Sequence, residues 1–173
     1  MKTILAICGS TRQNSINLEL LDIVANLFKE QIILKIFTQI ADLPHFNPDL
    51  DNENPPVNIL EFRDTLRNSD AILICTPEYA MGVPGTLKNA LDWTVSSMEF
   101  SNKPTALITA SSLGEKAHPA LLETLKVIES NIDKSTQLLI SVPRTKIKEG
   151  VITDAKTYEE IINLMNNLIQ KIA

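Results

Sequence analysis

The stretch that organises this chain reads Thr76-Pro77-Glu78-Tyr79-Ala80-Met81-Gly82-Val83-Pro84-Gly85. An apolar run, residues 71–75, precedes it, and a segment with helical spacing, residues 86–97, follows it. The two prolines stiffen this loop because each fixes a backbone φ angle, and the loop after a strand of an open parallel sheet is a common place for a ligand. The sequence therefore predicts a rigid, ligand-facing loop between a strand and a helix.

The start of the chain has the same order of strand, polar turn and helix. Residues 3–8 form an apolar run without alternation, as expected of a central parallel strand that is covered on both faces. Residues 9–14 are polar, and from Ser15 onward apolar residues recur every three or four positions, which predicts an amphipathic helix. Residues 32–37 are short and β-branched and predict the second strand.

The connection between residues 38 and 56 contains four prolines and several Asn and Asp residues. It predicts a long surface segment with at most one short helical turn. A connection of this length in a compact domain is uncommon and is often functional or part of an interface. A solvated excursion without a function is the other interpretation.

The remainder of the chain continues to alternate between helices and strands. Ser112-Leu113-Gly114-Glu115 has the spacing of a capping box and predicts the start of a helix that runs to about residue 130. In the third helix, Lys88 and Asp92 predict an exposed pair at positions i and i+4. The other predicted elements are a helix over 57–68, strands over 71–75, 105–110 and 137–142, a basic polar loop over 144–150, and a last helix capped at or near Asp154.

Five strands alternating with five helices, without an internal repeat, predict an α/β fold with an open parallel sheet and helices on both faces. The expected strand order is 2-1-3-4-5, which reverses between the first and third strands. Ligands bind such sheets at this reversal, so the loops after these two strands are the candidate site. With 173 residues and 44% apolar residues, we expect one domain over 1–173.

Composition argues against several function classes. The net charge is −5 and the basic residues are scattered, which disfavours a nucleic-acid partner. The first apolar run is shorter than the roughly 7–15 residues of a signal peptide, and no run approaches the ~18 residues of a membrane span. We therefore expect a soluble, cytoplasmic protein without a membrane partner. Cys8 and Cys75 provide neither a disulfide framework nor metal-ligand spacing, and two buried thiols are the simplest interpretation.

The loop after the first strand has the chemistry of a phosphate site. Between Gly9 and Asn17 it offers hydroxyls, the guanidinium of Arg12 and the amides of a helix N-terminus, all of which favour an anion. A helix cap formed by one of the hydroxyls and a solvated Arg12 are the alternatives. The segment has only one glycine and no lysine, so it matches neither the P-loop nor the dinucleotide fingerprint.

In the loop of residues 76–85, Tyr79 offers an aromatic face and Glu78 an acceptor. Gly82 and Gly85 permit close backbone approach. A packing role for Tyr79 and a surface position for Glu78 are the alternatives, and the predicted strand reversal favours the functional interpretation. The loop of residues 111–114, after the fourth strand, is a candidate for the third side of the site.

Both loops together resemble the NAD(P)H-dependent FMN reductase family of flavodoxin-like proteins. The resemblance covers nearly the whole chain. It rests on Gly9-Ser10-Thr11-Arg12-x-x-Ser15-x-Asn17, on Thr76-Pro77-Glu78-Tyr79, and on Val83-Pro84-Gly85-x-Leu87-Lys88-Asn89-Ala90-Leu91-Asp92-Trp93.

The resemblance implies a flavodoxin-like three-layer sandwich with noncovalently bound FMN and with NAD(P)H as electron donor. Electrons would pass to small acceptors such as free flavin, quinones, azo dyes or metal oxyanions. No catalytic side chain and no metal is implied, because the flavin carries the chemistry. The implied phosphate contacts are Ser10, Arg12, Ser15 and Asn17, and the implied contacts of the flavin ring are Pro77, Glu78, Tyr79, Ala80, Gly82, Ser111 and Gly114.

The sequence departs from the family pattern at Ala80, where the family often has Asn, and at the bulky Met81 that follows. A side-chain amide is lost there, although a backbone contact remains available. The resemblance also implies a homodimer or homotetramer, for which Trp93, Met98 and Phe100 are candidate contacts; core positions are the alternative. An FMN-binding electron carrier or redox sensor without NAD(P)H turnover, and a domain that binds another phosphate ligand, are the rival hypotheses.

Overall fold

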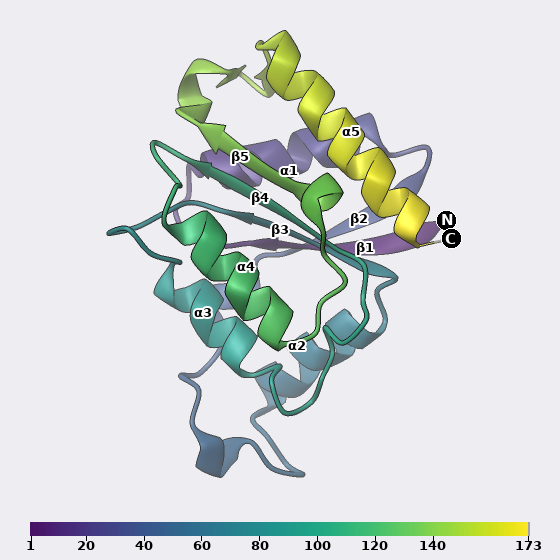
Figure 1. The fold of residues 1–173 in the computed structure, drawn as a ribbon. Helices are drawn as coiled ribbons and strands as arrows, with labels where there is room; N and C mark the ends of the chain where they lie inside the picture. Colours follow the sequence, from purple (N-terminus) through teal and green to yellow (C-terminus); the bar gives the residue numbers. More distant parts are fainter. Residues whose placement is uncertain (173) are drawn as a thin grey trace.

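A computed structural model describes residues 1–172 of the chain. Its central sheet contains five parallel strands in the order β2-β1-β3-β4-β5 (Figure 1), so the predicted order is confirmed. The order reverses between β1 and β3, as the alternation of strands and helices predicts. The strands are β1 (Lys2–Cys8), β2 (Ile32–Phe37), β3 (Ala71–Thr76), β4 (Thr105–Ser111) and β5 (Gln137–Ser141).

Helices cover both faces of the sheet, which gives three layers. In Figure 1, α1 (Ile16–Leu27) and α5 (Ala155–Lys171) lie on one side of the sheet, and α2 (Val57–Arg67), α3 (Gly85–Asp92) and α4 (Ala117–Val127) lie on the other. Alternate residues of each strand point to opposite layers, as the strand period of two requires. In β1, for example, Ile4 and Ala6 pack with α1 and α5, whereas Leu5 and Ile7 pack with the opposite layer.

Cys8 and Cys75 are directly opposite each other in the register of β1 and β3. Both are buried free thiols, and burial raises the pKa of each. A buried thiol with a raised pKa is rarely ionised and therefore unreactive. The structure thus agrees with the interpretation of two small core residues.

The connection over residues 38–56 is anchored to the protein at several points, although most of residues 47–54 are exposed to solvent. It contains two short 3₁₀ helices, η1 (Gln39–Asp42) and η2 (Pro48–Leu50), where the sequence predicts at most one turn. Trp93 Nε1 donates to the carbonyl of Pro44 at 2.9 Å, and Arg63 forms an ion pair of 2.7 Å with Asp51. Burial alone would raise the pKa of Asp51, but hydrogen bonds from Arg63 and Ser96 outweigh it and lower the pKa.

The third helix is shorter than its apolar spacing predicts, since α3 ends at Asp92 and not near Ser97. Two acceptors that a longer helix would use are taken by other groups. The Leu91 carbonyl accepts from the backbone and the hydroxyl of Thr94, and the Trp93 carbonyl accepts from Arg63. The chain therefore leaves the helix in a series of turns.

The predicted partner contacts near the end of α3 do not lie together on the surface. Trp93 and Phe100 are fully buried in the layer between the sheet and α2, α3 and α4, so both are core residues. Only Met98 is exposed. The predicted pair of Lys88 and Asp92 is present, with 2.5 Å between its charged atoms.

The predicted start of the fourth helix is wrong. Residues 112–115 do not form a capping box, and α4 begins at Ala117 after Lys116, whose side chain makes no cap. The cap comes from Glu78 in the loop after the neighbouring strand β3, whose Oε2 accepts from the amides of Lys116 at 2.8 Å and Ala117 at 2.7 Å. A cap supplied by a distant loop leaves no local signal.

The basic loop after β5 contains a small hairpin that was not predicted from the sequence. Its strands are β6 (Ile147–Lys148) and β7 (Val151–Ile152), with Gly150 at φ +74° in the turn. Between β5 and the hairpin, Val142 adopts a left-handed conformation with φ 50° and ψ 53°. α5 begins after Asp154, whose side chain accepts from the amide of Thr157, as predicted.

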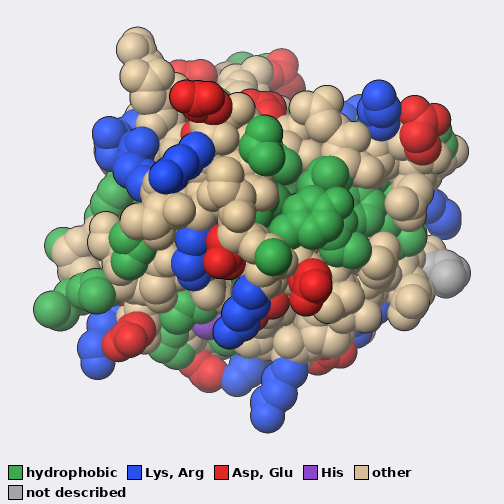
Figure 2. Space-filling model, turned by 90° about the horizontal axis from the view of Figure 1, so that it is seen from above, with side chains coloured by type: hydrophobic (Ala, Val, Ile, Leu, Met, Phe, Trp, Pro, Cys, Tyr) green, Lys and Arg blue, Asp and Glu red, His purple; other side chains and the backbone are tan. Residues whose placement is uncertain are grey.

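An apolar groove of about 260 Å³ lies where α1, the hairpin and α5 meet. Figure 2 shows hydrophobic side chains gathered in one patch among charged side chains on the face seen from above. The groove is lined by Ile23, Asn26, Leu27, Gly150, Val151, Ile152 and Tyr158.

None of the helices within residues 1–172 is long and apolar enough to cross a membrane.

Candidate functional site

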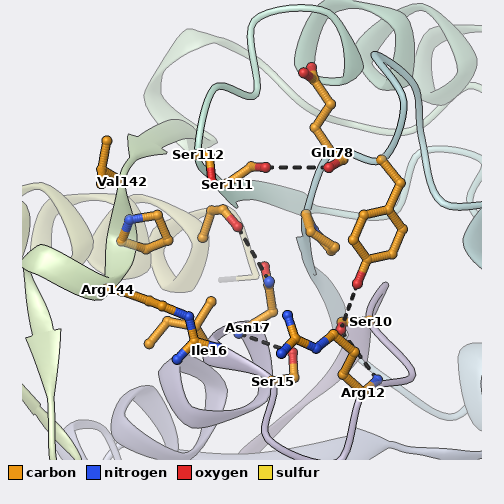
Figure 3. A pocket seen from close by; sticks show the side chains of 14 residues that line it. Ser10, Arg12, Ser15, Ile16, Asn17, Glu78, Ser111, Ser112, Val142 and Arg144 are labelled. Carbon is orange, nitrogen blue, oxygen red and sulfur yellow. Dashed lines mark hydrogen bonds between the residues drawn. The ribbon is translucent and has the colours of Figure 1, made fainter.

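A cavity of about 350 Å³ opens at the carboxyl edge of the sheet, where the strand order reverses. Loops from four strands surround it, so residues from distant parts of the sequence converge there (Figure 3). Eight of the eleven residues predicted to bind the cofactor line this cavity. They are Ser10, Arg12, Ser15, Asn17, Pro77, Glu78, Tyr79 and Ser111.

The loop after β1 surrounds the N-terminus of α1. Ser15 caps this helix, since its hydroxyl accepts from the amide of Asn17 at 3.2 Å. Ser10 accepts from the amide of Arg12 at 3.4 Å, and the guanidinium of Arg12 extends into the cavity (Figure 3). Capping and ligand contact are compatible here, because a hydroxyl has two lone pairs and one proton. This end of the cavity is suited to an anion.

The side-chain amide of Asn17, a predicted phosphate contact, forms hydrogen bonds within the protein at both its nitrogen and its oxygen. Its side chain is buried, donates to the Ala110 carbonyl at 3.3 Å and accepts from the Cys75 thiol at 3.4 Å. These contacts join α1 to β4 and β3. Asn17 therefore fixes the floor of the cavity and leaves little of its amide for a ligand.

The loops after β1 and β3 meet inside the cavity. The hydroxyls of Ser10 and Tyr79 are 3.4 Å apart, close enough for a hydrogen bond. Pro77 is buried beside them, whereas Tyr79 is 45% exposed and presents its ring to the cavity. The Gly9 amide donates to the Cys75 carbonyl at 2.8 Å, which holds the two loops in this arrangement.

Residues 79–82 form a tight hairpin turn that leads away from the cavity lining. Tyr79 and Gly82 exchange both backbone hydrogen bonds, and Ala80 and Met81 have φ angles of 49° and 61°. Two consecutive positive φ angles define a type I′ turn, which favours Asn followed by Gly. The turn conformation thus provides a reason for Asn at position 80 that does not depend on a ligand.

Glu78 lines the cavity with its backbone and directs its carboxylate elsewhere (Figure 3). That carboxylate caps α4, and the hydrogen bond from the Ala117 amide is the main cause of the lowered pKa of Glu78. The Glu78 carbonyl accepts from the hydroxyl of Ser111 at 3.4 Å. Glu78 is therefore a link between the cavity and α4, and its carboxylate is not a ligand acceptor in this arrangement.

Ala80, Gly82 and Gly114 do not line the cavity. Gly114 serves the packing of its loop: its φ is +87°, and a Cβ atom there would lie 2.5 Å from Leu139. Gly82 has no such requirement, because a Cβ atom would lie 3.7 Å from its nearest neighbour, the Tyr79 carbonyl. Ala80 and Gly82 belong to the turn that follows Tyr79 and lie outside the cavity lining.

Six further residues that were not predicted from the sequence also line the cavity. Arg144 is the most informative, because it adds a second guanidinium at the end where Arg12 lies. The available signal was its position in a basic loop directly after the fifth strand, at the same edge of the sheet. The six are Ile16, Ala110, Ser112, Val142, Pro143 and Arg144.

Comparison with protein-family models matches residues 2–141 to the family of NADPH-dependent FMN reductases. The chain belongs to this family. An NAD(P)H-dependent FMN reductase of Pseudomonas aeruginosa is 31% identical over 164 residues, which cover 91% of this chain and 88% of that protein. A quinone reductase of Pseudomonas putida is 40% identical over 114 residues, and the match spans only 60% of its length and 63% of this chain.

Solved structures show the same fold. The flavoenzyme NAD(P)H:(acceptor) oxidoreductase FerB of Paracoccus denitrificans superposes with a TM-score of 0.80 and 27% identity, covering 99% of this chain and 97% of FerB. A flavodoxin from the domain Archaea superposes with a TM-score of 0.65 over 99% of both chains at 13% identity. The predicted flavodoxin-like fold is confirmed.

The residues of the cavity fit the FMN that the family name implies. One end provides hydroxyls, guanidinium groups and a helix N-terminus, which match a phosphate. The other end provides Pro77, the ring of Tyr79 and adjacent backbone, which match a flat aromatic ring system. No cluster of three or more His, Cys, Asp or Glu side chains within residues 1–172 is arranged to hold a metal ion.

Proposed function

We propose that this protein is an FMN-containing oxidoreductase that takes electrons from NAD(P)H and passes them to small acceptors such as free flavin, quinones or azo dyes. Residues 1–173 would act as a single FMN-binding domain. The observation that carries the proposal is the contact between the hydroxyls of Ser10 and Tyr79. It joins an anion-binding loop and an aromatic loop in one open cavity at the strand reversal.

The chain's own residues bind and orient. Ser10, Arg12 and Ser15 would hold the phosphate at the N-terminus of α1, and the ring of Tyr79 with Pro77 would hold one edge of the flavin. Bound FMN would itself supply the hydride acceptance and the electron transfer, so no side chain has to act as acid or base. The two prolines and the contacts with α4 keep the second loop rigid, which positions the ring before a substrate arrives.

Three further properties belong to the proposal. The buried free thiols of Cys8 and Cys75 are typical of a reducing compartment, which supports a cytoplasmic location. The family resemblance implies a homodimer or homotetramer, for which the exposed apolar side chains of Met81, Val95 and Met98 are available as contacts. Small-molecule acceptors are the expected partners, because the cavity is open to solvent at the half-exposed ring of Tyr79.

Spectroscopy of the purified protein tests the proposal. We expect a yellow protein whose flavin absorbance is bleached within seconds by NADH or NADPH under anaerobic conditions. Bleaching by dithionite alone would support the electron carrier, and colourless protein that does not retain added FMN would rule out both flavoprotein hypotheses. A panel of flavins, quinones and azo dyes then identifies the acceptor class.

A matched pair of variants tests the phosphate assignment within this proposal. Arg12→Ala should weaken FMN retention, because it removes a charged donor from the anion-binding end of the cavity. Lys29→Ala removes a charge of the same sign at an exposed position after the end of α1 and should leave retention unchanged. Equal FMN affinity in both variants would refute the role of Arg12.

A further inference from the structure

Arg144 reaches the cavity through a strained turn. Val142 is β-branched and left-handed, with φ 50°, a conformation that is unfavourable for such a side chain. Its amide donates to the Ser111 carbonyl at 3.0 Å, and its carbonyl accepts from the amide and the hydroxyl of Thr145. This turn brings Pro143 and Arg144 back over the edge of the sheet to line the cavity.

From there Arg144 contacts the loop after β1. Its guanidinium donates to the Asn14 carbonyl at 3.3 Å, across 130 residues of sequence. The contact uses one of five donors, so the other donors can reach a ligand. Figure 3 shows Arg144 and Arg12 extending into the cavity from opposite sides, with Ser15 and Ile16 at its floor.

Two guanidinium groups and the positive end of α1 therefore gather at one end of the cavity. Like charges at such a place repel unless an anion lies among them. The acidic residue of the lining, Glu78, caps α4 with its carboxylate, and Glu19 in the first turn of α1 accepts from the Gly150 amide at 2.8 Å. The cavity lining therefore offers the two arginines no carboxylate.

We infer that Arg144 is a second cationic ligand of the flavin phosphate and that it sets the preference for FMN over riboflavin. The inference rests on the proposed function and names a residue outside the loop in which the phosphate contacts were expected. A dianionic phosphate is a suitable anion for two guanidinium groups at a helix N-terminus. Riboflavin has the same ring system and no phosphate, so it serves as the neutral reference ligand.

The test is a comparison of two dissociation constants for the full chain freed of flavin. FMN and riboflavin are titrated separately into wild type, Arg144→Ala and Lys148→Ala, and flavin fluorescence reports binding. Arg144→Ala should raise the Kd for FMN about tenfold, as expected for loss of a charge-assisted hydrogen bond, and leave the Kd for riboflavin unchanged. Lys148→Ala removes an exposed charge from the same basic loop and should change neither value.

The comparison separates ligand contact from loop positioning. If Arg144 only holds the loop at Asn14, Arg144→Ala would weaken both flavins by the same factor, and that result would overturn the inference. Arg144→Lys keeps the charge without the forked donors and should restore part of the preference for FMN. Unchanged FMN affinity in Arg144→Ala would also overturn it.

Failure of the proposed function has a different signature. A wild-type protein that binds neither flavin would refute the function and, with it, this inference. A wild-type protein that binds FMN, together with an Arg144→Ala variant that binds it equally well, would refute only the role of Arg144. Far-ultraviolet circular dichroism of each variant verifies that the substitutions at the exposed positions 144 and 148 leave the fold intact.

Discussion

Single residues near the site adopt conformations that their side chains do not favour. Ala80 and Met81 occupy the two central positions of a type I′ turn, where positive φ angles favour Asn and Gly. The departure from the family pattern at these positions thus affects the conformational energy of the turn as well as the groups available to a ligand. Because Met81 is 72% exposed, its side chain provides little packing in return within the described chain.

Met81→Gly should stabilise the protein. A left-handed residue other than glycine costs roughly 1–2 kcal/mol, and glycine loses roughly 0.5–1 kcal/mol of chain entropy, so the net gain is about 1 kcal/mol. For a chain of this length the melting temperature should rise by about 3 °C. Gly82→Ala is the control, because Gly82 has no positive φ and space for a Cβ atom; a melting temperature that does not rise in Met81→Gly would contradict the strain argument.

Gly9 is required for a different reason, which is the close approach of two loops. A Cβ atom on Gly9 would lie 2.3 Å from Thr76 Oγ1 and 2.8 Å from Thr76 Cβ. Thr76 is fully buried, so it has no room to move away. The glycine therefore allows the loops after β1 and β3 to pack against each other beneath the cavity.

Gly9→Ala should destabilise the protein by about 2 kcal/mol, in the range for an added methyl group in a packed core. It should also weaken FMN binding, because Ser10 is displaced with the loop. Chemical denaturation measures the first effect and flavin fluorescence the second. Gly85→Ala is the control, since nothing lies within 4 Å of a Cβ atom there; equal stability of both variants would refute the packing argument.

At the scale of elements, α4 depends on Glu78 for its N-terminal cap. The carboxylate accepts two amide hydrogen bonds at the start of the helix, where the helix dipole also favours negative charge. This link couples a helix of the outer layer to the loop that lines the cavity. A change of charge at Glu78 should therefore be detectable in the stability of the whole domain.

The stability difference between wild type and Glu78→Gln should depend on pH. Hydrogen bonding to the Ala117 amide lowers the pKa of Glu78 below its usual 4.5, so the folded state favours the ionised carboxylate. Its contribution is then present above pH 4.5 and is lost as the pH falls through the lower pKa of the folded state. Melting temperatures of both proteins should differ at neutral pH and converge in acid; a difference that does not change with pH would contradict the charged cap.

The sequence predicted elements best where their signal was local. The five strands and their order followed from apolar runs and from the alternation with helices. The sequence also predicted a cap by one of the hydroxyls between residues 10 and 15 and another at or near Asp154, and the structure has Ser15 and Asp154 at these positions. The end of α3 and the start of α4 were not predictable in this way, because Arg63 and Glu78 act from other parts of the chain. Arg144 was not predicted as a site residue, because it reaches the cavity through the left-handed conformation of Val142. No sequence pattern indicates that conformation.

At the scale of the molecule, the candidate site is a meeting point of four loops from one edge of the sheet. The loops after β1, β3, β4 and β5 all line the cavity, although 134 residues separate Ser10 from Arg144. A second cavity, of about 380 Å³, lies elsewhere, beside β2 and α2. A ligand in the first cavity should therefore connect distant parts of the sequence and leave the region around β2 unaffected.

Hydrogen–deuterium exchange with and without FMN should map this connection. Added FMN should slow exchange in residues 9–15, 76–82, 111–112 and 142–144, because a bound ligand stabilises the folded arrangement of these loops against local opening. Residues 35–43 line the second cavity and serve as an internal control that should not change. Riboflavin should protect residues 76–82 while leaving residues 142–144 close to their rate without ligand, since it has no phosphate for Arg144. Protection spread evenly over the chain, or confined to one loop, would contradict a site built from all four.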